Sequence, residues 1–137
     1  MVEFAFAFAV LFPLFTGTFE FGYGFFVYNQ MKNAVREGAR YASLRTYNAP
    51  DSAYTEAYGT AVKNIVVYGN PAGGPKPLVP GLTTANVLLT VTFVDRVPAQ
   101  VTVKIQNYQL STIFKRFVLS KPECTFPYIG RFAPNGT

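Results

Sequence analysis

Two carboxylates, Glu3 and Glu20, occur in an otherwise uncharged and strongly apolar part of the chain. No residue from Phe4 to Phe19 is charged, and Glu20 is the only charged residue between Phe4 and Tyr28. An ionised carboxylate in apolar surroundings is costly unless a cation pairs with it. The pattern therefore favours ion pairing with an amine or a guanidinium group over catalysis. For each carboxylate, the alternative is a solvated position at the edge of a membrane.

The rest of the composition excludes several kinds of catalytic and metal-binding site. The chain of 137 residues has no His and one Cys, which excludes a His-based triad, a His-ligated metal site, a zinc ribbon and an internal disulfide. No acid pair, nucleophile–base pair or phosphate loop can be named, so we expect no enzyme and no cofactor. The net charge of +5 is modest and scattered, which argues against nucleic acid as a partner. Burial is the commonest outcome for a thiol such as Cys124, and a free or interchain cross-linked thiol is the alternative.

The apolar stretch is long enough to cross a membrane. A helix from Phe4 to Tyr28 would be about 37 Å long, against about 30 Å for the hydrocarbon core of a bilayer. A cleaved signal peptide is disfavoured, because the start is acidic and the first cation is Lys32. Cations only after the span would direct the rest of the chain to the cytoplasm, yet that part resembles an exported, turn-rich domain. A basic leader that once preceded Met1 and was removed would resolve the conflict.

Seven aromatic residues recur along this stretch at spacings of four, four and three, close to the period of a straight helix. They are Phe4, Phe8, Phe12, Phe15, Phe19, Tyr23 and Phe26. Such a stripe, beside small residues such as Gly17, favours packing against other helices, and a chance stripe in a Phe-rich segment is the alternative. Pro13 lacks a backbone donor, so we expect a kink or a locally unwound stretch between Pro13 and Gly17.

The whole helix is expected to run from about Val2 to about Leu44 and to become amphipathic after Tyr28. One narrow apolar face of this second half is formed by Met31, Ala34, Val35, Gly38, Ala39 and Ala42. The small residues on that face predict close packing against a sheet. We therefore expect two parts: residues 1–28 as a hydrophobic transmembrane helix, and residues 29–137 as a helix-plus-sheet head domain.

A second helix is predicted after the first. Asp51-Ser52 offers an N-cap, an apolar face with helical spacing runs from Tyr54 to Val66, and Gly69-Asn70-Pro71 ends the helix. A loop rich in Pro and Gly follows.

The remaining residues predict strands. Residues 86–94 and 100–108 alternate with period two and predict a β-hairpin. Residues 110–119 suit either a strand or a short helix, and residues 124–132 predict a last strand. The fold class is thus α+β: a long N-terminal helix, a second helix, and an antiparallel sheet of three to four strands packed on the long helix.

Four segments together carry a family resemblance: Val2-Glu3-Phe4-Ala5, Pro13-Leu14, Glu20-Phe21-Gly22 and the run from Asn33 to Ala42. They resemble the TadE-like pseudopilin family, which belongs to the tight-adherence (Tad) branch of type IV pilus machinery. The resemblance implies a type IV pilin-like fold and a structural subunit of an extracellular filament, with residues 1–28 as the filament-core helix, and no enzymatic activity. The alternatives are a minor pseudopilin that primes or tips a filament of another subunit, and a single-pass anchored binding domain that does not polymerise.

The family also implies partners and a location. The precursor would cross the inner (cytoplasmic) membrane once and would meet a prepilin peptidase and the pilus assembly motor and platform. Copies of the chain would then form a helical homo-polymer at the cell surface, with an adhesion target of unknown identity. Glu3 would pair with the free amine of a neighbouring subunit, and Glu20 with cations such as Lys32 or Arg36 of neighbouring subunits. The sequon at Asn135 is a candidate glycosylation site, although three-residue matches of this kind are common.

Overall fold

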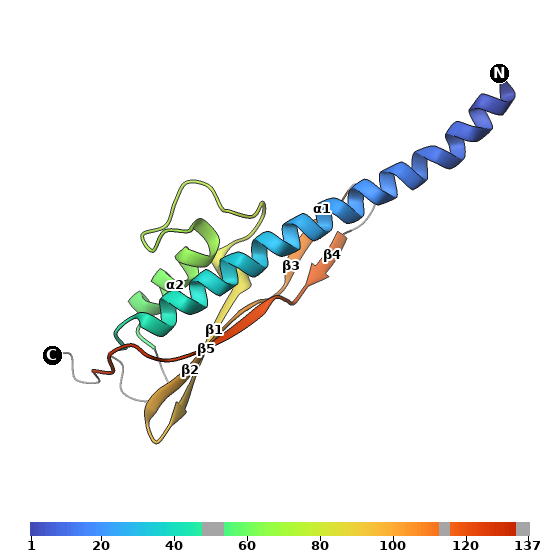
Figure 1. The fold of residues 1–137 in the computed structure, drawn as a ribbon. Helices are drawn as coiled ribbons and strands as arrows, with labels where there is room; N and C mark the ends of the chain where they lie inside the picture. Colours follow the sequence, from blue (N-terminus) through green and yellow to red (C-terminus); the bar gives the residue numbers. More distant parts are fainter. Residues whose placement is uncertain (48–53, 113–115, 134–137) are drawn as a thin grey trace.

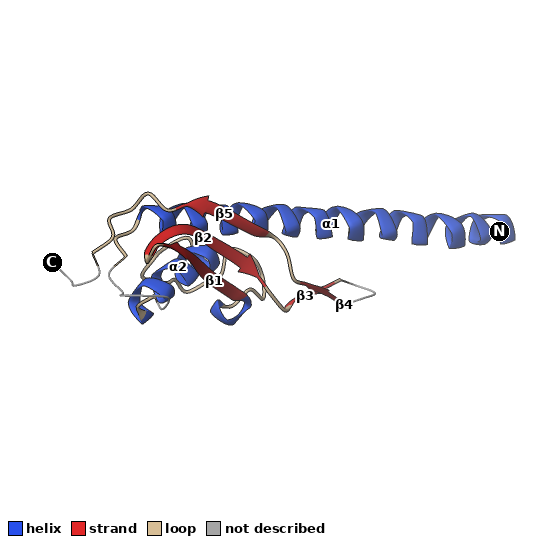
Figure 2. Ribbon diagram, turned by 90° about the horizontal axis from the view of Figure 1, so that it is seen from below, coloured by secondary structure: helices blue, strands red, loops and turns tan. Residues whose placement is uncertain are grey.

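A computed structural model describes residues 1–47, 54–112 and 116–133 of the chain. It consists of one long helix and a small α+β head that covers only part of that helix (Figure 1). The long helix, α1, runs from Val2 to Leu44 and confirms the bounds predicted from the sequence. Its C-terminal half lies against α2 and a sheet, whereas its N-terminal half projects away from the head (Figure 2).

Helix α1 continues unbroken through Pro13, so the predicted local unwinding between Pro13 and Gly17 is wrong. One proline removes a single hydrogen bond, and the many remaining bonds of a long cooperative helix outweigh that loss. Two hydroxyl groups add bonds beside it. The Thr16 hydroxyl donates to the Phe12 carbonyl at 2.8 Å, and the Thr18 hydroxyl donates to the Leu14 carbonyl at 3.0 Å.

Helix α2, Glu56–Tyr68, begins later than its sequence pattern indicates. Its N-cap is Thr55, whose hydroxyl accepts a 3.4 Å hydrogen bond from the Tyr58 N–H. The predicted cap at Asp51-Ser52 is therefore wrong, and both residues lie outside the described part of the chain. At the other end, Gly69 adopts φ 73°, which suits glycine, and its N–H donates to the Ile65 carbonyl at 2.9 Å.

Three antiparallel strands form the main sheet in the order β1-β2-β5, with bounds Val87–Val94, Val97–Ile105 and Glu123–Pro127. A short 3-10 helix, Thr84–Asn86, precedes β1. Strand β2 starts three residues earlier than predicted, because Asp95 and Arg96 alone make the turn, with positive φ values of 51° and 66°. The pairing shifts between Thr92 and Phe93, and this irregularity accommodates Pro98 within β2.

The ambiguous segment 110–119 contributes to a second, two-stranded antiparallel sheet. Strands β3, Tyr108–Ser111, and β4, Arg116–Leu119, pair with Leu110 opposite Phe117. This hairpin is the part of the head nearest to the bare half of α1 (Figures 1 and 2). The alternative of a short helix at 110–119 is thus wrong for the residues that the structure describes.

The core lies between the C-terminal half of α1, helix α2 and the main sheet. The two helices approach each other closely at Gly38, because a Cβ atom there would collide with the Val66 side chain. The expectation that the small residues of α1 would pack closely against a sheet is therefore incomplete. Helix α1 also contacts β2 and β5, so it is covered by a helix on one side and by strands on the other.

Candidate assembly surface

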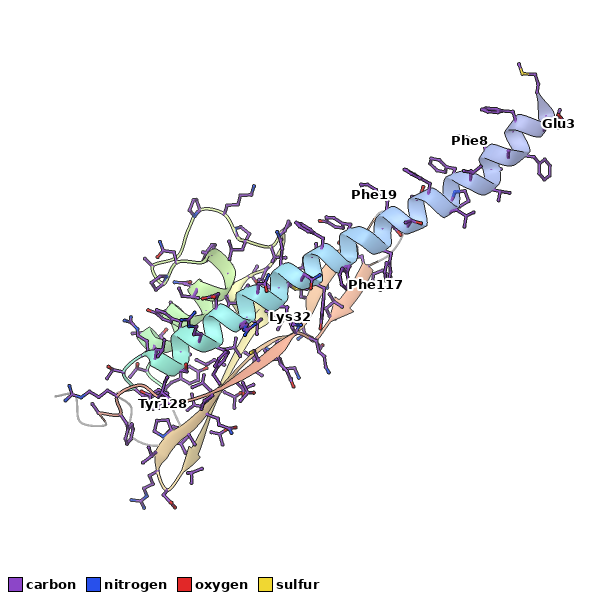
Figure 3. The ribbon with its side chains drawn as sticks, viewed as in Figure 1. Glu3, Phe8, Phe19, Lys32, Phe117 and Tyr128 are labelled. Carbon is purple, nitrogen blue, oxygen red and sulfur yellow. The ribbon has the colours of Figure 1, made fainter. Side chains whose placement is uncertain are left out.

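The N-terminal half of α1, residues 2–26, forms an apolar arm that the head leaves uncovered. All seven aromatic residues of the predicted stripe are exposed, with exposed fractions from 41% at Tyr23 to 76% at Phe4. The rings of Phe8 and Phe12 stack on each other, with centroids 5.5 Å apart, and Figure 3 shows Phe8 and Phe19 projecting from the bare helix. The chain's own head therefore does not bury the stripe.

An arm of this composition is unfavourable in water. Leaving a Phe side chain exposed forgoes about 1.5–3 kcal/mol relative to full burial. By length and composition α1 is one helix that could cross a membrane, and none of its most apolar window is buried inside the chain. Lipid tails or the helices of other chains are the surroundings that would cover such a surface.

The N-terminal part of the stripe points away from the head. Gly17 and Gly24 face the β3–β4 hairpin, and at about 100° per residue Phe8 and Phe12 lie roughly 140–180° around the axis from Gly17. Nearer to the head, Phe19 and Tyr23 line a pocket with residues 111 and 112, so this end of the stripe borders the hairpin. A neighbouring helix could reach the stripe without displacing the head.

An apolar groove of about 400 Å³ separates the glycine side of the arm from the hairpin. Its lining comes from α1 and from the two hairpin strands: Gly17, Glu20, Phe21, Gly24, Phe25, Tyr28, Leu110, Thr112, Phe117 and Leu119. The Leu110 Cδ2 atom would lie 3.7 Å from a Cβ on Gly24, so the hairpin approaches the arm closely at that glycine. Sequence reasoning missed this groove, because no local pattern indicates that strands β3 and β4 lie against α1.

The two acids of the arm have different surroundings. Glu3 is exposed in the first turn of α1, where the helix dipole favours a negative charge, and it marks the far end of the arm (Figure 3). Lys32, the first cation in the chain, is about 44 Å further along the helix. Glu20 is half-buried and lines the groove together with Thr112, so it lies against its own hairpin. Its pairing with Lys32 or Arg36 of another subunit stays a prediction.

The six residues predicted to pack α1 onto the head are all buried, and they are Met31, Ala34, Val35, Gly38, Ala39 and Ala42. Val27, one turn earlier, belongs to the same core. Lys32, Arg36 and Arg40 occupy the exposed side. This separation of apolar and charged side chains anchors the arm in the head along several helical turns.

A cluster of tyrosines, which sequence reasoning also missed, fastens the C-terminal end of α1. The Tyr58 hydroxyl donates to the Ala42 carbonyl at 2.6 Å, and the Tyr128 hydroxyl donates to the Arg45 carbonyl at 2.7 Å. The Tyr47 ring packs edge-on against Tyr58, with centroids 5.4 Å apart. Burial raises the pKa of the Tyr47 hydroxyl to about 12 and raises the pKa of Tyr58 as well. These side chains connect α1 to α2 and to the segment after β5.

No cluster of three or more metal-ligating side chains occurs among the residues that the structure describes. Cys124 is half-buried on β5, opposite Val103 of β2, and its sulfur is a free thiol. Asn135 lies outside the described residues. Within residues 1–47, 54–112 and 116–133, the largest exposed apolar feature is therefore the arm with its groove.

A family model described as TadE-like protein matches residues 1–40. The match covers the arm and the first turns of the buried half of α1, and it confirms the resemblance recognised in those residues. Members of this family are Tad pilus-associated pseudopilins with a hydrophobic N-terminal helix. Proteins of this family are structural components of pili. Searches of curated proteins and of solved structures each gave no match.

Proposed function

We propose that this chain is a structural subunit of an extracellular type IV-like filament, assembled by packing its apolar arm among the arms of other copies. One observation carries the proposal: all seven rings of the aromatic stripe are exposed along the arm, so the chain itself leaves them available to other helices. A helix that served only as a membrane anchor would need apolar character, but no ordered stripe beside small residues. The family match to residues 1–40 supports the same function.

Assembly would move the arm from one apolar environment to another. In the precursor the arm lies in the inner membrane, and in the filament it lies among other helices. Each environment hides the same Phe and Ala surface from water, so the transfer costs little and a motor can drive it. The head, residues 29–137, would remain folded and form the outer shell, while residues 1–28 form the core helix.

Glu3 supplies the specific contact in this proposal. It is the only acid among the first 19 residues of the chain, so no neighbouring side chain could replace it. The N-terminal amine of an adjacent subunit, released by a prepilin peptidase, would carry a positive charge into the apolar core. Pairing with Glu3 would satisfy both charges and set the axial position of one arm relative to the next.

The deciding experiment is electron microscopy of material sheared from the surface of the native host, with gold-labelled antibody against the head. Label along the whole length of each filament would support the proposed function. Label confined to filament ends would instead establish a minor pseudopilin. Subunit found only in the membrane fraction, with no labelled filament, would leave the anchored binding domain as the better account.

A further inference from the structure

The β3–β4 hairpin is the part of the head that reaches furthest back along the arm (Figures 1 and 2). Leu110 and Phe117 lie opposite each other in the hairpin and both face α1 across the groove. The groove extends along α1 as far as Gly17, which is within the uncharged part of the arm. The hairpin therefore lies alongside the last turns of the apolar arm, whereas the main sheet lies beside the amphipathic half of α1.

The length of the arm sets the depth at which the hairpin would lie in the membrane-bound precursor. From Phe4 to Tyr23 the helix rises about 30 Å, which equals the thickness of a hydrocarbon core. Glu20 is the first charged residue after Glu3, so the boundary between hydrocarbon and headgroups falls near Glu20 to Gly24. Because Gly24 is the residue that Leu110 approaches, the hairpin lies at this boundary.

The chemistry of the hairpin suits that depth. Phe117 is 48% exposed and Val118 is 63% exposed, and they point to opposite faces of β4, as successive strand residues do. Arg116, at the start of the same strand, is exposed. Apolar side chains on both faces beside a cation are poorly suited to water, but they suit the zone where acyl chains meet lipid phosphates.

We propose that the groove and strand β4 bind lipid of the leaflet on the head's side, so that the head docks on the membrane surface before assembly. The upper part of an acyl chain would occupy the apolar groove beside Phe117, and Arg116 would reach a lipid phosphate. This inference rests on the proposed function, because only an inserted arm brings the hairpin to the boundary. Lipid is favoured over a second copy of the chain as occupant. The length of the arm alone places the groove at the boundary of the hydrocarbon core, where lipid surrounds it in the precursor before copies assemble.

Tryptophan fluorescence tests this placement, since the chain contains no Trp and each introduced Trp is a unique reporter. The full-length variant Phe117→Trp is reconstituted in vesicles of phosphatidylethanolamine and phosphatidylglycerol that carry nitroxide-labelled lipid. We expect blue-shifted emission and stronger quenching by a nitroxide near the headgroup than by one near the end of the acyl chain. Val94→Trp, at the far end of the β1–β2 hairpin and 59% exposed, is the matched control and should not be quenched.

A third reporter separates failure of this inference from failure of the proposed function. Phe8→Trp lies within the arm and should be quenched by the deep nitroxide. Quenching at position 8 without quenching at position 117 would overturn lipid binding and leave filament assembly untouched. Absence of quenching at both positions would overturn the membrane-bound precursor and this inference together. A Trp at position 117 that stays in water in vesicles but becomes shielded in filaments would assign the groove to a second copy of the chain.

Discussion

The Tyr58 hydroxyl lies 2.6 Å from the carbonyl oxygen of Ala42, so helix α2 is hydrogen-bonded to the last turns of α1. That carbonyl is near the helix terminus, where the last four carbonyl groups lack partners within the helix. The bond joins residues 16 positions apart and links the end of α1 to the first turn of α2. The bond therefore helps to hold α1, the helix that continues into the arm, in place against the head.

Removing this bond should weaken the head. We expect Tyr58→Phe to lower the free energy of unfolding by about 1–3 kcal/mol, because a buried carbonyl loses its donor. Urea unfolding of the detergent-solubilised subunit, followed by circular dichroism, measures the change. Tyr47→Phe is the matched control, since the Tyr47 hydroxyl is buried and has no hydrogen-bond partner among the described residues. Equal losses in the two variants would show that the bond to Ala42 contributes nothing specific.

A second prediction concerns the approach of α1 to α2 at Gly38. A methyl group there would collide with Val66, so Gly38→Ala should destabilise the head by about 1–3 kcal/mol. Gly22→Ala is the control, because a Cβ at Gly22 would meet no atom within 4 Å among the described residues. The control should leave unfolding of the head unchanged in the same assay. A Gly38→Ala variant as stable as wild type would contradict the close helix packing.

Alkaline pH should unfold the head through its buried tyrosines. Burial raises the pKa of Tyr47 from 10.0 to about 12, so the folded state keeps a proton that the unfolded state releases. Stability is therefore complete below pH 10 and falls as the pH rises towards 12, by up to about 1.4 kcal/mol per pH unit for each such tyrosine. Urea midpoints across this window measure the slope. Tyr47→Phe should reduce it, and an unchanged slope would exclude Tyr47 as a contributor.

Glu3 should be required for assembly but not for folding. We expect Glu3→Leu to reduce or abolish sheared filaments in the native host, while subunit accumulates in the membrane with a folded head. The reason is that the N-terminal amine of a neighbouring subunit would lose its counter-charge in an apolar core. Glu3→Asp retains the charge and should preserve part of the yield. Filaments of normal length and number from Glu3→Leu would remove Glu3 from the mechanism.

The aromatic stripe should contribute to assembly in proportion to the surface that it buries. Replacing Phe12 and Phe15 together by Ala removes ring surface worth at most about 1.5–3 kcal/mol each, so filament yield should fall while unfolding of the head stays unchanged. Leu88→Ala, an exposed apolar residue of β1 in the head, is the control and should not affect yield. Equal yields from both variants would mean that other surfaces hold the arms together.

Much of the fold follows from short stretches of sequence. Helix α1 has the predicted bounds, Val2–Leu44, because its hydrogen bonds join residues four apart and its apolar periodicity is visible over the same distance. The β1–β2 hairpin was likewise foreseeable from alternating residues, although its turn of two residues placed β2 three positions earlier than predicted. The existence of the aromatic stripe belongs here too, because its regular spacing lies within one helix.

Only the tertiary structure decided which surfaces of that helix are available. The bond from Tyr128 to Arg45 joins residues 83 positions apart, and Leu110 of β3 lies beside Gly24, so no local pattern could place either contact. The cap of α2 at Thr55 was likewise not indicated by its local sequence pattern. The sequence by itself thus determined a long apolar helix and its aromatic stripe, which depend on neighbouring residues. Long-range packing of the head decided that the stripe stays bare while the glycine side of the arm lies under a hairpin.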